Sequence, residues 1–246
     1  MIIQLIKKMT DFGQYLTEKT GLRLSEEKLS SLSKIYRVED FTGEKLFEMA
    51  NNLVNPETSF FRNMEIANLL KNLMEKDNRR IWFAGCSTGQ EVYSTFLLSK
   101  KTVDLDLVGT DISFDSINHA KKGKYVLHRS KEIEKVDMFK NEPFLNIFPS
   151  ESLTSVHVEF NQSLRRIIHF DTHNLVTGPY SFGYDIVVCR NVLLHMTDKG
   201  KLQVLKSLAE SVKNGGYLLL GDTDPKMNSD SWMRIKEGNL VIWKKL

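Results

Sequence analysis

The sequence predicts an α/β protein with a parallel sheet, preceded by a helical domain and interrupted by a small antiparallel β-insertion. From about residue 80, short apolar segments alternate with helical ones, which is the pattern of parallel strands joined by crossover helices. Residues 1–63 instead carry apolar residues at mostly helical spacing. Residues 126–170 break the α/β rhythm and include a segment of alternating apolar and polar residues. We therefore predict that residues 64–125 and 171–246 together form the α/β domain.

The 246-residue chain has the composition of a globular protein, with 41% hydrophobic and 26% charged residues. Its net charge of +3 is too small to indicate nucleic-acid binding. Two cysteines without paired spacing, Cys86 and Cys189, favour a reducing, cytoplasmic location and two small buried side chains. No segment approaches about 18 consecutive apolar residues, and residues 1–12 have the pattern of an amphipathic helix rather than a signal peptide. We therefore expect no insertion into a membrane.

The N-terminal region contains one clear helix start and one break. Ser25 precedes Glu26 and Glu27, which predicts an N-cap followed by acidic residues in the first helical turn. The segment VNPETSFFRN, residues 54–63, then interrupts the helical pattern at Pro56 and places two phenylalanines directly before an arginine.

The α/β region alternates regularly between strand and helix signals. Strands are expected at residues 80–85, 106–111, 184–190 and 217–222, helices at 89–101, 113–123 and 197–216, and a pair of edge strands at 232–245. Ser113 is the expected N-cap of the second helix and Gly123 its end, whereas glycines close the third.

The insertion begins with a helical segment, KEIEKVDMF, and continues with two expected antiparallel strands, SVHVEF (155–160) and LRRIIHF (164–170). The alternating SVHVEF strand is expected to offer an edge to which an extended segment of a protein substrate can add. Such an insertion is either a specificity device or a surface elaboration.

The first strand of the α/β region ends in a glycine-bounded turn, residues 85–89, that leads into a helix. Unpaired backbone N–H groups at the positive end of a helix form a seat for a polar or anionic ligand. The spacing is neither that of a dinucleotide fingerprint nor that of a phosphate loop. Glu91 stands in the first helical turn, where it would repel a pyrophosphate and suit a cationic group better.

Polar residues follow two further strands at the same expected edge of the sheet. Asp111, about twenty residues after the turn, can accept hydrogen bonds from two ribose hydroxyls, or it can simply cap the next helix. An acid at this place occurs in both nicotinamide and S-adenosylmethionine enzymes, so it does not choose the cofactor. Arg190 and Asn191 follow the strand that begins at residue 184.

Four motifs together resemble the CheR-type chemotaxis receptor methyltransferases, over nearly the whole chain. They are NPETSFFRN, GCSTGQEVYS, VGTDISFDSINHAKKGKY and FGYDIVVCRNVLLHM, in this order. The resemblance implies a class I S-adenosylmethionine-dependent methyltransferase sheet with an N-terminal helical domain and an inserted β-subdomain. It also implies O-methylation of glutamate side chains on the cytoplasmic domain of chemotaxis receptors, with S-adenosylhomocysteine as the product. We expect a monomer that binds no nucleic acid.

The resemblance also implies roles for individual residues. Arg62 and His195 are the implied catalytic residues, with Arg62 facing both the reacting carboxylate and the methionine end of the cofactor. Implied cofactor-binding residues are Thr58, Arg62, Gly85, Glu91, Asp111, Ile112, Asn174, Leu175, Asn191 and Val192. Among these, Glu91 would lie near the cofactor ammonium, Asp111 at the ribose, and Asn174 with Leu175 beside the adenine.

Two other functions stay open at this point. The N-terminal region is shorter than in most family members, and His195 replaces a tyrosine, so a regulatory or scaffold protein that binds cofactor but turns over weakly is one alternative. Another is a small-molecule methyltransferase, which the insertion and the TSFFR match disfavour. His195 itself could instead be a partly exposed cap of the following helix. The histidines show no metal-site spacing, so no metal is expected.

Overall fold

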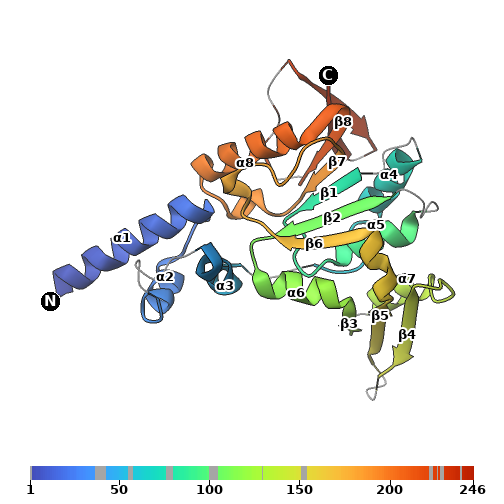
Figure 1. Ribbon diagram of the computed structural model, residues 1–246, viewed down its shortest axis with the longest axis horizontal. Helices are drawn as coiled ribbons and strands as arrows, with labels where there is room; N and C mark the ends of the chain where they lie inside the picture. The colour runs from blue at the N-terminus through green and yellow to red at the C-terminus, as the bar shows by residue number, and fades with distance from the viewer. Residues whose placement is uncertain are drawn as a thin grey trace.

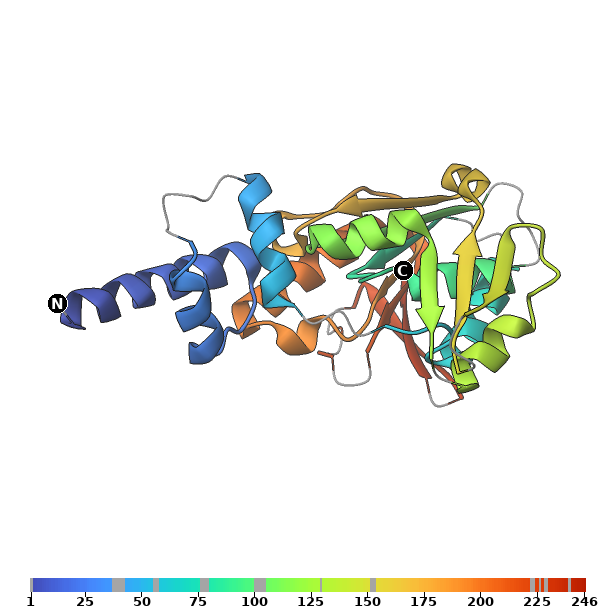
Figure 2. The ribbon, with the colours of Figure 1, turned by 90° about the horizontal axis from the view of Figure 1, so that it is seen from below.

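A computed structural model describes residues 2–36, 43–54, 58–75, 80–99, 105–128, 130–150, 154–221, 224–225, 227, 230–238 and 240–246. Pro56, at which we predicted a break in the helical pattern, lies outside the described residues. The molecule is elongated, with the N-terminal helices at one end and a small antiparallel sheet at the other (Figures 1 and 2). The large sheet lies between them.

The N-terminal region is helical, as the sequence predicts. It forms α1 (Ile2–Thr20), α2 (Glu26–Ser33) and α3 (Gly43–Leu53), and α4 (Met64–Met74) follows before the sheet. The side chain of Ser25 accepts a hydrogen bond from the backbone N–H of Lys28 at 3.3 Å, which confirms the predicted N-cap of α2. Phe12 and Leu16 of α1 are buried.

The large sheet has seven strands in the order β6-β2-β1-β7-β8-β10-β9. The first five run parallel, and β10 pairs in antiparallel fashion with both β8 and β9. The bounds are β1 (Arg80–Ala84), β2 (Asp106–Asp111), β6 (Ile168–Thr172), β7 (Tyr184–Cys189), β8 (Val212–Leu220), β9 (Trp232–Glu237) and β10 (Leu240–Lys245). This arrangement confirms the predicted α/β class.

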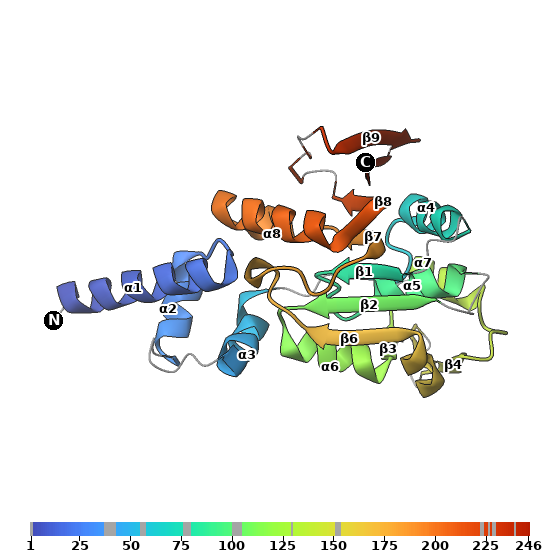
Figure 3. The same cartoon turned by 45° about the horizontal axis from the view of Figure 1, so that its top comes forward.

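Helices cover both faces of this sheet (Figure 3). Successive strand residues point to opposite faces, so Phe83 packs in a core with α5 (Gln90–Leu98) and α6 (Phe114–Lys122), whereas Trp82 packs in a second core with α8 (Asp198–Ser211). The N-terminal helices α1, α2 and α3 contribute to the second core, and the insertion contributes to the first. The buried side chains of the two appended modules therefore belong to different cores, although α3 also contacts the start of α6 through Asn51.

The insertion holds a three-stranded sheet in the order β3-β5-β4. Its elements are β3 (Lys124–Leu127), α7 (Ser130–Asp137), β4 (Leu145–Pro149) and β5 (Val156–Phe160). The prediction that SVHVEF forms an edge is wrong, because β5 pairs with β3 on one side and β4 on the other. The free edges belong to β3 and β4.

Three other predicted elements differ in the structure: the segment LRRIIHF, the end of the third predicted helix, and the pair of edge strands. LRRIIHF folds into a 3₁₀ turn, η2 (Gln162–Arg166), and then β6, which pairs in parallel with β2 of the large sheet. Alternation of buried Ile168 and Phe170 predicts a strand but cannot tell which sheet it joins. The small antiparallel sheet therefore begins with β3 at Lys124, and β6 belongs to the large sheet. The division into domains itself stays a prediction.

At the C-terminal end, α8 stops at Ser211, before the glycines that were predicted to close it. Gly216 lies inside β8, where an added Cβ would approach the carbonyl oxygen of Asp185 to 2.8 Å. The glycine thus permits a close approach between strands rather than ending a helix. In addition, β10 lies between β8 and β9, so of the predicted pair of edge strands only β9 is an edge. Among the described helices, none is both long and apolar enough to cross a membrane.

Candidate active site

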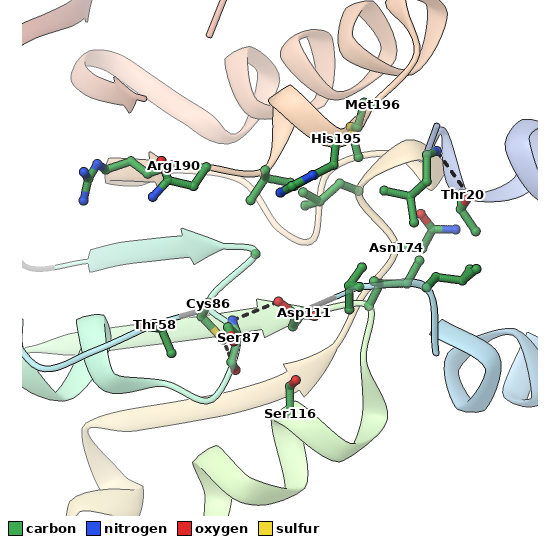
Figure 4. A pocket seen from close by; sticks show the side chains of 18 of the residues that line it. Thr20, Thr58, Cys86, Ser87, Asp111, Ser116, Asn174, Arg190, His195 and Met196 are labelled. Atoms are coloured by element: carbon green, nitrogen blue, oxygen red, sulfur yellow. Dashed lines mark hydrogen bonds between the residues drawn. The ribbon is translucent and has the colours of Figure 1, made fainter. Parts of the chain in front are cut away.

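A cavity of about 230 Å³ lies at the carboxyl ends of β1, β2 and β7, where parallel sheets bind ligands. Every residue that was predicted to bind cofactor or act in catalysis lines it: Thr58, Arg62, Gly85, Glu91, Asp111, Ile112, Asn174, Leu175, Asn191, Val192 and His195. Figure 4 shows Arg190 and Thr58 toward one end of this cavity and Thr20 with Asn174 toward the other. The structure thus brings together residues from six separate chain segments.

The glycine-bounded turn forms the floor between β1 and β2. The N–H groups of Gly85 and Cys86 both donate to the carbonyl oxygen of Thr110, at 2.7 and 2.9 Å. Gly85 has φ +80°, and a Cβ there would clash with the side chain of Val192. Glycine is therefore required both by backbone conformation and by the close approach of the loop after β7.

Asp111 joins this turn to the start of α6. Its Oδ2 accepts the N–H of Ser87 at 2.8 Å (Figure 4). Its Oδ1 accepts the N–H of Ser113 at 2.9 Å. Burial raises the pKa of the Asp111 carboxyl, while these backbone donors act to lower it. The N-cap of α6 is Ser113, so the alternative that Asp111 merely caps the helix is wrong. Each carboxylate oxygen can still accept a further hydrogen bond from a ligand hydroxyl.

Glu91 has a partner that the sequence did not reveal. Arg190 Nη1 lies 2.7 Å from Glu91 Oε1, and the Arg190 side chain is only 10% exposed. The two residues follow neighbouring strands, β1 and β7, so their pairing depends on strand order and not on local sequence. The pair places one cationic and one anionic group side by side in the cavity, which is the arrangement that an amino-acid zwitterion requires.

Thr58 and Arg62 come from the loop between α3 and α4. Phe60 and Phe61 anchor this loop, because both are almost completely buried. Phe61 has φ +50°, a left-handed conformation that costs a bulky residue about 1–3 kcal/mol. Directly after it, Arg62 has an exposed side chain at the cavity.

His195 ends a short 3₁₀ turn, η4 (Leu193–His195), and its side chain is exposed at the cavity. Its backbone carbonyl accepts the N–H of Arg23 at 2.8 Å. The following helix, α8, is capped by Thr197, whose Oγ1 accepts the N–H of Gly200 at 3.1 Å. The alternative in which His195 caps α8 is therefore wrong.

Comparison with known proteins shows the family of the chain that carries this site. The family described as "CheR methyltransferase, SAM binding domain" matches residues 56–241. The chain belongs to the CheR methyltransferase family. A "Chemotaxis protein methyltransferase" of Borreliella burgdorferi is 26% identical over 245 residues, covering 87% of this chain and 83% of that protein. One of Listeria monocytogenes is 31% identical over 182 residues, covering 70% and 66%, and one of Vibrio anguillarum is 26% identical, covering 87% of each.

S-adenosylmethionine is the cofactor of this CheR methyltransferase, and the cavity fits it. Buried polar atoms of two lining residues, Ser87 Oγ and Arg190 Nε, have no hydrogen-bond partner within the described part of the chain. Such atoms are normally satisfied by a ligand or by water. Asp111 can serve the ribose, while Glu91 and Arg190 suit the ammonium and carboxylate of the methionine part.

Asn174 borders the other end of the cavity but uses its side chain differently from the prediction. Its Nδ2 donates to the carbonyl oxygen of Lys19 at 2.7 Å, and its Oδ1 accepts the N–H of Val176 at 3.3 Å. The amide therefore ties α1 to the α/β domain, and the side chain is 3% exposed. Its place beside the adenine stays a prediction.

An N-terminal wall, which no local sequence pattern predicted, closes this end of the cavity. The wall consists of Thr20, Leu22, Arg23, Lys28, Leu53 and Val54. It is attached through Thr197, whose N–H donates to the carbonyl oxygen of Gly21 at 2.8 Å, and through a bridge between Leu22 and Met196. These contacts join residues that lie about 175 positions apart in the chain. Local sequence patterns cannot reveal contacts over such a separation. All six wall residues precede the segment that matches the family's SAM binding domain.

Proposed function

We propose that this protein transfers the methyl group of S-adenosylmethionine to glutamate side chains on the cytoplasmic part of chemotaxis receptors, and that it acts in the cytoplasm. The observation that carries the proposal is the convergence of Arg62, Glu91, Arg190, Asp111 and His195 on one cavity. The relatives named as chemotaxis protein methyltransferases support the same substrate class. Membership in an enzyme family disfavours the scaffold alternative.

The chemistry asks little of the protein beyond alignment. Bound S-adenosylmethionine supplies a methyl group on a positively charged sulfur, and a glutamate carboxylate, with an ordinary pKa of about 4.3, is already ionised at neutral pH. No general base is therefore needed. Arg62, exposed at the cavity, can attract the carboxylate and orient it. The pairing must stay loose, because a close ion pair would reduce the nucleophilicity of the carboxylate.

Apolar residues around the cavity limit the access of water. Leu22, Leu175 and Met196 are buried in its walls. Excluding water strengthens every electrostatic interaction within the site and removes hydration from the reacting carboxylate. His195 supplies a ring N–H that can donate to a substrate oxygen, in place of the tyrosine hydroxyl of relatives.

The small sheet of the insertion is the proposed contact for the receptor. Because β5 is central, an extended receptor segment would have to pair with β3 or β4. Of these, β4 presents Phe148, a large apolar side chain that is 48% exposed. Added main-chain hydrogen bonds and an apolar anchor are the usual means of strand addition. The monomeric state and the lack of nucleic-acid binding stay predictions.

The deciding experiment uses methyl-labelled S-adenosylmethionine and receptor-containing membranes. We expect base-labile label on the receptor, released as methanol, because a glutamate methyl ester hydrolyses in base. Membranes whose receptor glutamates are replaced by alanine are the control. Binding of S-adenosylhomocysteine without transfer to any receptor would favour the regulatory or scaffold function. Label that appears only on small molecules would favour the third alternative.

A further inference from the structure

We propose that helix α7 of the insertion is a clamp that orients Arg62 for the reaction, with Glu132 and Lys135 as positioning residues. Neither side chain lines the cavity. The inference rests on the proposed role of Arg62 in the site. It assigns to the insertion a task in building the reaction centre, in addition to any contact with the receptor.

Two charged side chains of α7 hold backbone groups of Phe60 and Phe61, the two residues just before Arg62. Glu132 Oε1 accepts the N–H of Phe60 at 2.7 Å, and Lys135 Nζ donates to the carbonyl oxygen of Phe61 at 2.9 Å. Both are charge-assisted hydrogen bonds, which are shorter and stronger than bonds between neutral groups. The carbonyl that Lys135 holds belongs to the peptide that joins Phe61 to Arg62, so its orientation sets the direction in which Arg62 leaves the loop.

The loop needs such support because Phe61 is held at φ +50°. A bulky side chain persists in this region only where the surroundings over-determine the backbone, and such residues cluster at functional sites. Two further contacts act on the same residue. Its N–H donates to Ser94 Oγ of α5 at 2.9 Å, and its ring stacks on Phe139 at a centroid distance of 5.3 Å and an interplanar angle of 12°.

The partners of the clamp lie far apart in sequence but meet in one place. Glu132 and Phe60 are 72 positions apart, and Lys135 and Phe61 are 74 apart. Beyond Arg62, Asn63 begins α4 and accepts the N–H of Ile66 at 3.1 Å, which fixes the other end of the loop. Arg62 is thus supported from α5, α7 and α4, and a shift of α7 would turn the peptide from which Arg62 projects.

The test compares variants of the two clamp residues with variants of exposed residues on the same helix. Glu132→Ala and Lys135→Met remove the clamp, whereas Glu134→Gln and Lys131→Met change exposed residues of the same helix. Calorimetry measures binding of S-adenosylhomocysteine and of 5′-methylthioadenosine, which lacks the amino-acid part that Arg62 is proposed to face. We expect each clamp variant to weaken binding of S-adenosylhomocysteine about tenfold, with 5′-methylthioadenosine unchanged. Glu132→Gln keeps an acceptor oxygen and should restore most of the affinity, and the control variants should match the parent.

A double-mutant cycle with Arg62→Ala separates positioning from a merely structural role. If Glu132 acts through Arg62, Glu132→Ala should cause no further loss of S-adenosylhomocysteine affinity in the Arg62→Ala protein. Full additivity, or an equal loss for both ligands, would overturn the proposal, as would parental affinity in both clamp variants. Should Glu132→Ala not fold, Lys135→Met tests the same clamp at the adjacent carbonyl. Absence of receptor methylation by the parent would reject the proposed function, yet the contrast between the two ligands would still decide the clamp.

Discussion

The two ends of the cavity are built in different ways. At the end that is expected to hold the adenosine, buried side chains and backbone hydrogen bonds join the end of α1, the end of η4 with the residues just after it, and the loop after β6 into a continuous wall. At the methyl-transfer end, charged groups dominate, and each depends on a second element: Glu91 on Arg190, and Arg62 on the loop that α7 holds. The first end is suited to affinity and the second to orientation, since fixed backbone groups bind without reorganising and charged side chains respond to the substrate.

The largest effect is expected from Asp111→Ala, at the centre of the cavity. The change removes the proposed acceptor for the ribose and also leaves the N–H groups of Ser87 and Ser113 without their partners. We expect affinity for S-adenosylhomocysteine to fall about 100-fold, measured by calorimetry. Asp115→Ala, which changes an exposed acid in the first turn of α6, is the control and should bind as the parent does. Unchanged affinity in Asp111→Ala would remove this residue from the site.

Asp111 also predicts the pH dependence of cofactor binding. Ligand hydroxyls donate to its ionised form, and burial raises the pKa of this carboxyl. Affinity should therefore decline as pH falls through the raised pKa, at a higher pH than for an ordinary carboxyl group. Asp111→Asn should show a weaker affinity without this decline. The stability of the free protein has the opposite pH dependence. The buried, ionised Asp111 carboxylate lowers the free energy of unfolding at higher pH, and this penalty disappears on acidification.

At the methyl-transfer end, Arg190→Gln should weaken S-adenosylhomocysteine binding about thirtyfold, because it removes the partner of Glu91 and a buried donor. The same variant should bind 5′-methylthioadenosine as well as the parent does, since that ligand lacks the charged amino-acid part. A loss of affinity for S-adenosylhomocysteine alone would show that Arg190 acts only at the methyl-transfer end of the cavity. An equal loss for both would mean that Arg190 supports the whole cavity rather than one end of it.

Gly200→Ala tests the adenosine end through its attachment. A Cβ on Gly200 would lie 2.7 Å from the carbonyl oxygen of Gly21, so the N-terminal wall must shift. Alanine is also more favourable than glycine in a helix by about 1 kcal/mol. This gain offsets part of the loss in the free energy of unfolding that the strain causes. We therefore expect about a tenfold loss of affinity for both ligands with little change in thermal stability. Lys199→Ala, at an exposed position of the same helical turn, is the control.

The sequence predicts the local parts of this molecule well and the long-range parts poorly. The turn from Gly85 to Gly89, the cap at Ser113 and the helix end at Gly123 depend on a few adjacent residues, and all appear as predicted. The pairing of Glu91 with Arg190 and the wall around Leu22 depend on which segments meet in space. A period of alternating residues also cannot assign a strand to its sheet, which is why residues 168–170 were placed in the insertion.

The insertion also packs against the large sheet, so deleting it does not test receptor binding alone. Replacing the insertion by a short flexible loop would remove Tyr125, Val158 and Phe160 from the first core, which contains Phe83. The ring of Phe160 stacks on the ring of Tyr93 with a centroid distance of 4.1 Å. Loss of receptor methylation would then follow from loss of packing or of the α7 clamp, whatever the receptor contacts. Single changes on the exposed surface of β4, such as Phe148→Ser, separate receptor contact from support of the site.

The smallest effect is expected at His195, whose position in the backbone does not depend on its side chain. Its carbonyl holds Arg23 in any variant, so substitutions test the ring alone. If the ring N–H donates to a substrate oxygen, His195→Ala should lower the rate of receptor methylation about fivefold, which corresponds to one neutral hydrogen bond. His195→Tyr restores a donor and should retain most of the rate, while both variants bind S-adenosylhomocysteine as the parent does. Equal methylation rates in all three proteins would place His195 outside the reaction and leave the orientation of the glutamate to Arg62 and the loop that carries it.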